Sequence, residues 1–183
     1  MFKRPKMSWG ERGFTLVELL VVVAIVAILA AVLIPQLLPY TQNARVSQAM
    51  GDLASMKSVI ESYAANEGKG QYPKAGTPST WNGGALTSGM DVSVVLQSKG
   101  INWTGANGGM MDPWERPYRY TVFTDTNGNI WGYKIESAGP NKKPGDSDDI
   151  YVTNRERVTQ GQPPQTITGL NPGASETSNG STY

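Results

Sequence analysis

The sequence predicts an α+β fold in which a long N-terminal helix packs on a small antiparallel sheet. Three observations support this fold. Residues 14–34 are apolar over a membrane-spanning length, apolar residues continue at helical spacing to residue 65, and two alternating segments flank the pair Asn127-Gly128. The first half of the helix is therefore expected to span a membrane, and the remainder to pack under a globular head formed by residues 68–152.

The segment 14–34 has the length of a transmembrane helix. Its 21 residues would extend roughly 31 Å at about 1.5 Å per residue, and the hydrocarbon core of a bilayer is about 30 Å thick. The leader, residues 1–13, is basic and holds Lys3, Arg4, Lys6 and Arg12 against Glu11. Such a leader stays cytoplasmic, so a single-pass topology with the head outside is expected. A cleaved secretory signal is the alternative, although its apolar core spans only about 7–15 residues.

A single carboxylate, Glu18, lies inside the apolar segment. A charged group near the centre of a membrane helix costs about 2.5–3.5 kcal/mol on insertion scales, and less towards the ends. Glu18 is either drawn to the interface without a role, or it pairs with a cationic group of another subunit. The second interpretation makes Glu18 an assembly residue that fixes the register between helices.

The stretch Gly13-Phe-Thr-Leu-Val-Glu18, with the apolar run that ends at Pro35, resembles the N-terminus of type IV pilins and type II secretion pseudopilins. The resemblance implies cleavage between Gly13 and Phe14 by a prepilin peptidase, and N-methylation of Phe14. Glu18 would then pair with the Phe14 amine of a neighbouring copy in a homopolymeric filament. It further implies an inner-membrane anchor, an extracytoplasmic head, an inner-membrane assembly platform, minor pilins, and a periplasmic or cell-surface filament.

The N-terminal helix is expected to cover residues 14–67. Pro35 and Pro39 lie where the chain leaves the membrane, and each predicts a bend or a locally melted turn. This feature is either a simple kink or a joint that lets the head reorient. Beyond it, one apolar stripe contains Val46, Ala49, Met50, Leu53, Met56, Ile60 and Tyr63.

The head is expected to hold one short helix and a β-hairpin. Asp91 is a candidate N-cap for a helix that ends near Gly100. The segments 119–123 and 130–136 read as antiparallel strands, joined through Asn127-Gly128. The polar residues of that connector are assigned to hairpin chemistry and not to a metal site.

The motif Asp112-Pro-Trp-Glu-Arg-Pro-Tyr118, with residues 137–141 and 148–150 downstream, resembles the major pseudopilins. Glu115 departs from the family, which usually has Gly there. The resemblance implies a calcium site at Asn141, Asp148 and Asp149, although Asn141 stands where the family commonly has Asp. Calcium favours six to eight oxygen ligands. The alternative is a solvated acidic turn.

The remaining sequence limits the function. Residues 153–183 are rich in small polar residues and are expected to form a flexible tail. Without Cys or His the usual catalytic triads and zinc sites are excluded, and the nearly balanced charge (16 Lys+Arg, 15 Asp+Glu) gives no indication of nucleic-acid binding. The expected function is that of a non-enzymatic pseudopilin of type II secretion. Alternatives are a type IV pilin for adhesion, motility or DNA uptake, and an anchored binding or catalytic head that does not polymerise.

Overall fold

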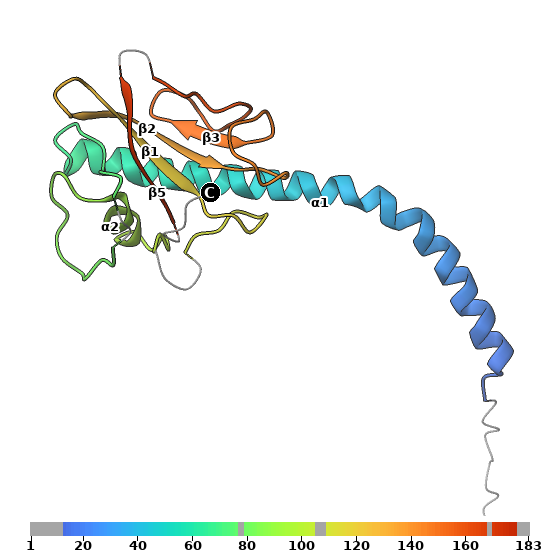
Figure 1. Ribbon diagram of the computed structural model, residues 1–183. Helices are drawn as coiled ribbons and strands as arrows, with labels where there is room; N and C mark the ends of the chain where they lie inside the picture. Colours follow the sequence, from blue (N-terminus) through green and yellow to red (C-terminus); the bar gives the residue numbers. More distant parts are fainter. Residues whose placement is uncertain (1–12, 77–78, 105–108, 168–169, 179–183) are drawn as a thin grey trace, which may run out of the picture. The chain divides into compact units, whose positions relative to one another are not determined.

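The computed structural model describes residues 13–76, 79–104, 109–167 and 170–178. The chain divides into two compact units, Met1–Thr41 and Gln42–Tyr183, and residues 1–12 of the predicted leader lie outside the described part. The elements follow one another in chain order, and all but β4 carry a label in Figure 1. They are α1 (Leu16–Asn66), α2 (Val92–Gln97), β1 (Arg119–Thr124), β2 (Ile130–Ser137), β3 (Ile150–Thr153), β4 (Thr159–Gln160) and β5 (Asn171–Thr177).

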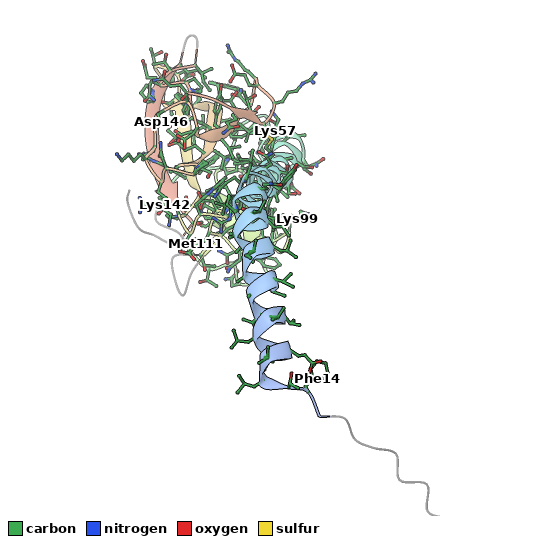
Figure 2. The ribbon with its side chains drawn as sticks, turned by 90° about the vertical axis from the view of Figure 1, so that its right-hand side faces the viewer. Phe14, Lys57, Lys99, Met111, Lys142 and Asp146 are labelled. Carbon is green, nitrogen blue, oxygen red and sulfur yellow. The ribbon has the colours of Figure 1, made fainter. Side chains whose placement is uncertain are left out.

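The first unit consists of the first half of α1. The helix runs unbroken through Pro35 and Pro39, so the locally melted turn is absent: each proline removes one backbone donor, and the neighbouring helical bonds remain. None of residues 14–34 is buried, and their side chains project from all sides of the helix (Figure 2). Among the described residues α1 is the one helix long and apolar enough to cross a membrane.

In the second unit, the rest of α1 packs on one face of the sheet. The predicted stripe is confirmed, because Leu53, Met56 and Ile60 are fully buried. They share one core with Tyr120 of β1 and Ile135 of β2. Each such side chain contributes about 1.5–3 kcal/mol through removal from water. This burial holds the helix to the head.

Polar contacts fix the register between α1 and the sheet. Tyr118 Oη donates to Asp52 Oδ2 at 2.9 Å, and Tyr133 Oη donates to Glu61 Oε1 at 2.9 Å. Burial, followed by the Glu61 charge, raises the pKa of the Tyr133 hydroxyl. Tyr133 therefore stays a donor, and both hydroxyls are satisfied inside an otherwise apolar interface.

The sheet is antiparallel throughout, with strand order β4-β3-β2-β1-β5. The predicted hairpin is confirmed, with Tyr120 opposite Ile135. In its connector the Asp125 carboxylate accepts the backbone N–H groups of Asn127 (2.8 Å) and Asn129 (2.9 Å). These contacts are the Asx-type turn bonds expected of a hairpin. The short helix is also present, as α2.

The expectation of a flexible tail over residues 153–183 is wrong for the part that the structure describes. β5 pairs along the outer edge of β1, and β4 pairs with β3. Lys57 of α1 donates through Nζ to the carbonyl oxygens of Thr153 (2.6 Å) and Glu156 (2.9 Å). The edge of β1 that lies away from β2 offers backbone groups for pairing, so main-chain hydrogen bonds order β5. Buried Ile167, and Val158 packed against the core, also hold the segment to the head.

Glu115 occupies a left-handed backbone conformation, with φ 67°. The turn around it is held by Asp112, whose Oδ1 accepts the N–H groups of Trp114 (3.0 Å) and Arg116 (2.8 Å). The position where the resemblance expects Gly thus keeps a geometry suited to Gly. A side chain there costs free energy because Cβ crowds the adjacent carbonyl oxygen.

Glu115→Gly should raise the free energy of unfolding by about 0.5–1 kcal/mol, because strain relief exceeds the added entropy of the unfolded chain. The measurement is thermal unfolding of the full chain in detergent micelles, followed by tryptophan fluorescence. Glu156→Gly, at an exposed position with ordinary φ, is the matched control and should be neutral or destabilising. Equal effects in both variants would contradict the strain argument.

Candidate assembly motif and acidic loop

Glu18 forms a capping box at the start of α1. Its Oε2 accepts hydrogen bonds from Thr15 N (2.9 Å) and Thr15 Oγ1 (2.8 Å), while Glu18 N donates to Thr15 Oγ1 at 3.2 Å. Such reciprocal contacts satisfy backbone donors that the first helical turn leaves unpaired. The carboxylate also lies at the positive end of the helix dipole. Glu18 is therefore stabilised within its own chain.

Thr15 is a site residue that the sequence reasoning missed. The Thr-x-x-Glu spacing of a capping box was readable at residues 15–18. Because Thr15 contacts Oε2 alone, Oε1 of Glu18 has no hydrogen-bond partner among the described residues and can accept from a further donor. The local structure thus orients the acid and leaves one of its oxygens for a second partner.

The predicted processing residues lie before the helix. Gly13 and Phe14 have no regular secondary structure, and Phe14 is 85% exposed. Figure 2 shows Phe14 at the N-terminal start of α1. The peptide bond between the two residues is therefore accessible to another protein. Pro35, the other predicted assembly residue, lies inside α1.

The predicted metal residues meet in one loop, between β2 and β3. Asp148 and Asp149 come together with a third carboxylate, Asp146, and one oxygen of each lies within 4.8 Å of the others. Asn141 joins them as a donor, with its Nδ2 2.6 Å from Asp146 Oδ2 and 2.7 Å from Asp148 Oδ1. Gly139 fixes the turn of the chain, because an added Cβ there would lie 2.3 Å from the Asp148 carbonyl oxygen.

Asp149 is the member of this cluster whose negative charge is least well compensated. The residue is fully buried, and its Oδ2 accepts from the N–H groups of Gly145 (2.5 Å) and Asp146 (3.3 Å). Its Oδ1 is buried without a hydrogen-bond partner among the described residues. Burial foremost, and then the charges of Asp146 and Glu136, raise the pKa of Asp149 to about 6. Burial also raises the pKa of Asp148. The loop thus concentrates negative charge that a cation would neutralise.

Comparison with known proteins adds the family context. Residues 10–34 match the prokaryotic N-terminal methylation motif. The chain is 48% identical over 60 residues to a fimbrial protein of Pseudomonas aeruginosa, covering 33% of this chain and 38% of the relative. It is 33% identical over 105 residues to a fimbrial protein of Neisseria meningitidis serogroup B (57% and 55%). It is 37% identical over 95 residues to the type IV major pilin protein PilE of Neisseria gonorrhoeae (52% and 56%). No solved structure matches.

The motif at residues 10–34 is that of prepilin-type proteins, and it precedes a helix packed on an antiparallel sheet. More particularly, the chain is similar over part of its length to proteins named as fimbrial protein and type IV major pilin. It spans between 38 and 56% of the length of these relatives. The matches support the resemblance to type IV pilins found in the sequence, whereas they do not support the narrower assignment to the major pseudopilins.

The raised pKa of Asp149 predicts a pH-dependent loss of stability in chelator-treated protein. The pKa of this carboxyl group rises from 3.8 to about 6 on folding. Its ionisation therefore does not lower the free energy of unfolding well below pH 3.8, and lowers it by the full amount above about pH 6. Relative to Asp149→Asn, the wild type should lose roughly 1–3 kcal/mol between pH 4 and pH 7. Denaturant unfolding at both pH values measures this difference.

Glu115→Gln removes a carboxylate from an exposed position and serves as the control for the change of charge. If the stability difference between the wild type and Asp149→Asn is the same at pH 4 and pH 7, burial does not penalise the Asp149 carboxylate.

Proposed function

We propose that this protein is the structural, non-enzymatic subunit of a type IV pilus, with the apolar residues 14–34 packed in the filament core. The observation that carries the proposal is Glu18, an acid in an apolar helix with no buried residue from 14 to 34. A helix that is apolar on every side needs lipid or other helices around it. Relatives named as fimbrial proteins and type IV major pilins support the choice of filament.

In this proposal, a prepilin peptidase cleaves between Gly13 and Phe14, and the new amine on Phe14 is methylated. The methylated amine keeps its positive charge. It approaches Glu18 of an adjacent copy, whose Oε1 the capping box leaves available. An ion pair in a low-dielectric surrounding is strong, and an unpaired charge there is costly. Assembly would require an inner-membrane platform and minor pilins, with the head outside the membrane.

A pseudopilin of type II secretion is the second candidate. It is favoured by the buried Asp112, which ties the Asp-Pro-Trp turn to β2 through Ser137 Oγ at 2.6 Å, and by the cysteine-free head. The two candidates differ in where the filament grows. Immunogold electron microscopy with antibodies against the head separates them: surface fibres indicate a pilus, and labelling confined to the periplasm indicates a pseudopilus.

We further propose that the acidic loop binds calcium. Asp146, Asp148 and Asp149 supply three carboxylates within 4.8 Å, and the partnerless Oδ1 of Asp149 fits a demand for a cation. Asn141 would have to present its amide oxygen in place of the donor group that it now directs at Asp146 and Asp148. Bound calcium would supply positive charge that pins the loop after β2, as a disulfide could in other heads.

Glu18→Ala should abolish filament assembly without preventing membrane insertion, because the intersubunit counter-ion is lost. Glu18→Gln separates two roles of the side chain, since an amide oxygen keeps the capping contacts but carries no charge. If pairing with the Phe14 amine drives assembly, Glu18→Gln should also give no filaments. Membrane fractionation and electron microscopy of each variant provide the measurements.

Normal filaments from Glu18→Ala would overturn the assembly role. If Glu18→Gln forms filaments and Glu18→Ala does not, the role of Glu18 in assembly is limited to helix capping.

Calcium should raise the melting temperature of the full chain in micelles, because it binds the folded state alone. Millimolar calcium against excess chelator provides the comparison. Asp148→Asn should remove the shift, whereas Asp125→Asn, in the hairpin connector, should keep it. Because protons compete at Asp149, the shift should shrink as the pH falls below about 6. An unchanged wild-type melting temperature would exclude the site.

A further inference from the structure

The outer face of the sheet, opposite α1, carries buried charge. Lys134 and Glu136 of β2 are only 6% and 3% exposed. Lys134 Nζ lies 2.6 Å from Glu136 Oε2, and Arg119 Nη1 of β1 lies 3.8 Å from Glu136 Oε1. Two cationic groups therefore converge on one carboxylate. Charges are seldom buried in a small head unless they have a structural or binding role.

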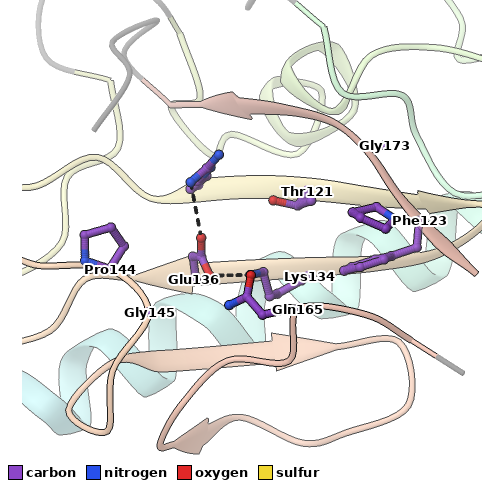
Figure 3. Close-up of a pocket in the computed structure, with 10 residues that line it drawn as sticks. Thr121, Phe123, Lys134, Glu136, Pro144, Gly145, Gln165 and Gly173 are labelled. Atoms are coloured by element: carbon purple, nitrogen blue, oxygen red, sulfur yellow. Dashed lines mark ion pairs between the residues drawn. The ribbon is translucent and has the colours of Figure 1, made fainter.

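These side chains line a cavity of about 270 Å³. In Figure 3, Lys134 and Glu136 lie between Thr121 on β1 and Gln165 on the C-terminal segment. Pro144 and Gly145, from the acidic loop, form another part of the wall. The volume equals roughly nine water molecules at about 30 Å³ each, which suits a ligand of a few non-hydrogen atoms. The cavity is thus a small polar site.

The donors in this cavity outnumber the acceptors. A lysine ammonium has three N–H donors, and among the described residues Lys134 finds one acceptor, Glu136. The Arg119 guanidinium adds a second positive charge to the lining. The Thr121 hydroxyl adds a donor, and the Gln165 amide, whose Nε2 also donates to the Pro163 carbonyl oxygen at 3.4 Å, adds polar groups. Among the described residues that line the cavity, Glu136 is the single acid against the bases Lys134 and Arg119, so the lining carries a formal charge of +1. A ligand that supplies acceptors and negative charge would complete the site.

We propose that this cavity binds a compact oxyanion, a carboxylate or a phosphate group, through Lys134 and Arg119. Glu136 holds the two cations in place, so it is a positioning residue for the site. Gln165 belongs to the segment between β4 and β5, and closing of the site therefore depends on the ordering of the C-terminal strands. This site is separate from the assembly motif. It adjoins the acidic loop, because Pro144 and Gly145 line the cavity and Gly145 N donates to Asp149 Oδ2.

The test is isothermal titration calorimetry of the full chain in detergent micelles. Sodium phosphate and sodium acetate serve as probes, with sodium chloride at matched ionic strength as the blank. We expect saturable one-to-one binding of at least one probe, and the tighter probe identifies the source of the oxyanion. Absence of saturable binding for both probes overturns the proposal.

Two variants at exposed or half-buried positions locate the binding. Arg119→Gln removes a cation and should weaken binding about ten-fold, whereas Arg157→Gln, outside the cavity, should not. Gln165→Glu places a competing carboxylate in the wall and should weaken binding similarly, with Gln162→Glu as its control. If Arg119→Gln fails to fold, the comparison of Gln165→Glu with Gln162→Glu tests the location of binding by itself. Equal affinities within a pair that folds would overturn the assignment to this cavity.

Discussion

One helix meets two different environments along its length. From residue 14 to residue 34 no side chain of α1 is buried within the chain, and these residues are apolar almost without exception. Between Ala49 and Ala64 the same helix buries a single stripe and leaves its other faces polar. The first pattern demands an apolar surrounding, and the second fits one face of a sheet. The remainder of the head is arranged around that second half.

The fold could be predicted wherever burial leaves a periodic trace in the sequence. Leu53, Met56 and Ile60 recur at helical spacing, and β1 and β2 alternate around an Asn-Gly turn, so both features were readable. β5 gave no such trace. Its residues, from Asn171 to Thr177, include no large apolar side chain, and their order comes from backbone pairing with an edge that only the folded sheet creates.

The residues of the assembly motif and of the acidic loop could be predicted from the sequence, but the directions of their side chains could not. Glu18 stands out because a carboxylate in an apolar run is costly, and the loop acids stand out by composition. The sequence could not show that Asn141 directs its amide nitrogen at two carboxylates, or that one oxygen of Asp149 is buried alone. Side-chain direction and local dielectric are properties of the packed loop, and both depend on residues distant in the chain, such as Glu136.

The way in which β5 joins the sheet affects how the surface of the head can diverge. A strand held through main-chain groups keeps its place when its outward side chains are exchanged, provided that proline does not replace a residue whose N–H is in the ladder. At an exposed position of this edge, such as Asn171, an exchanged or labelled side chain therefore leaves the hydrophobic core intact, whereas Gly173 lies against Val122 and Thr177 is buried.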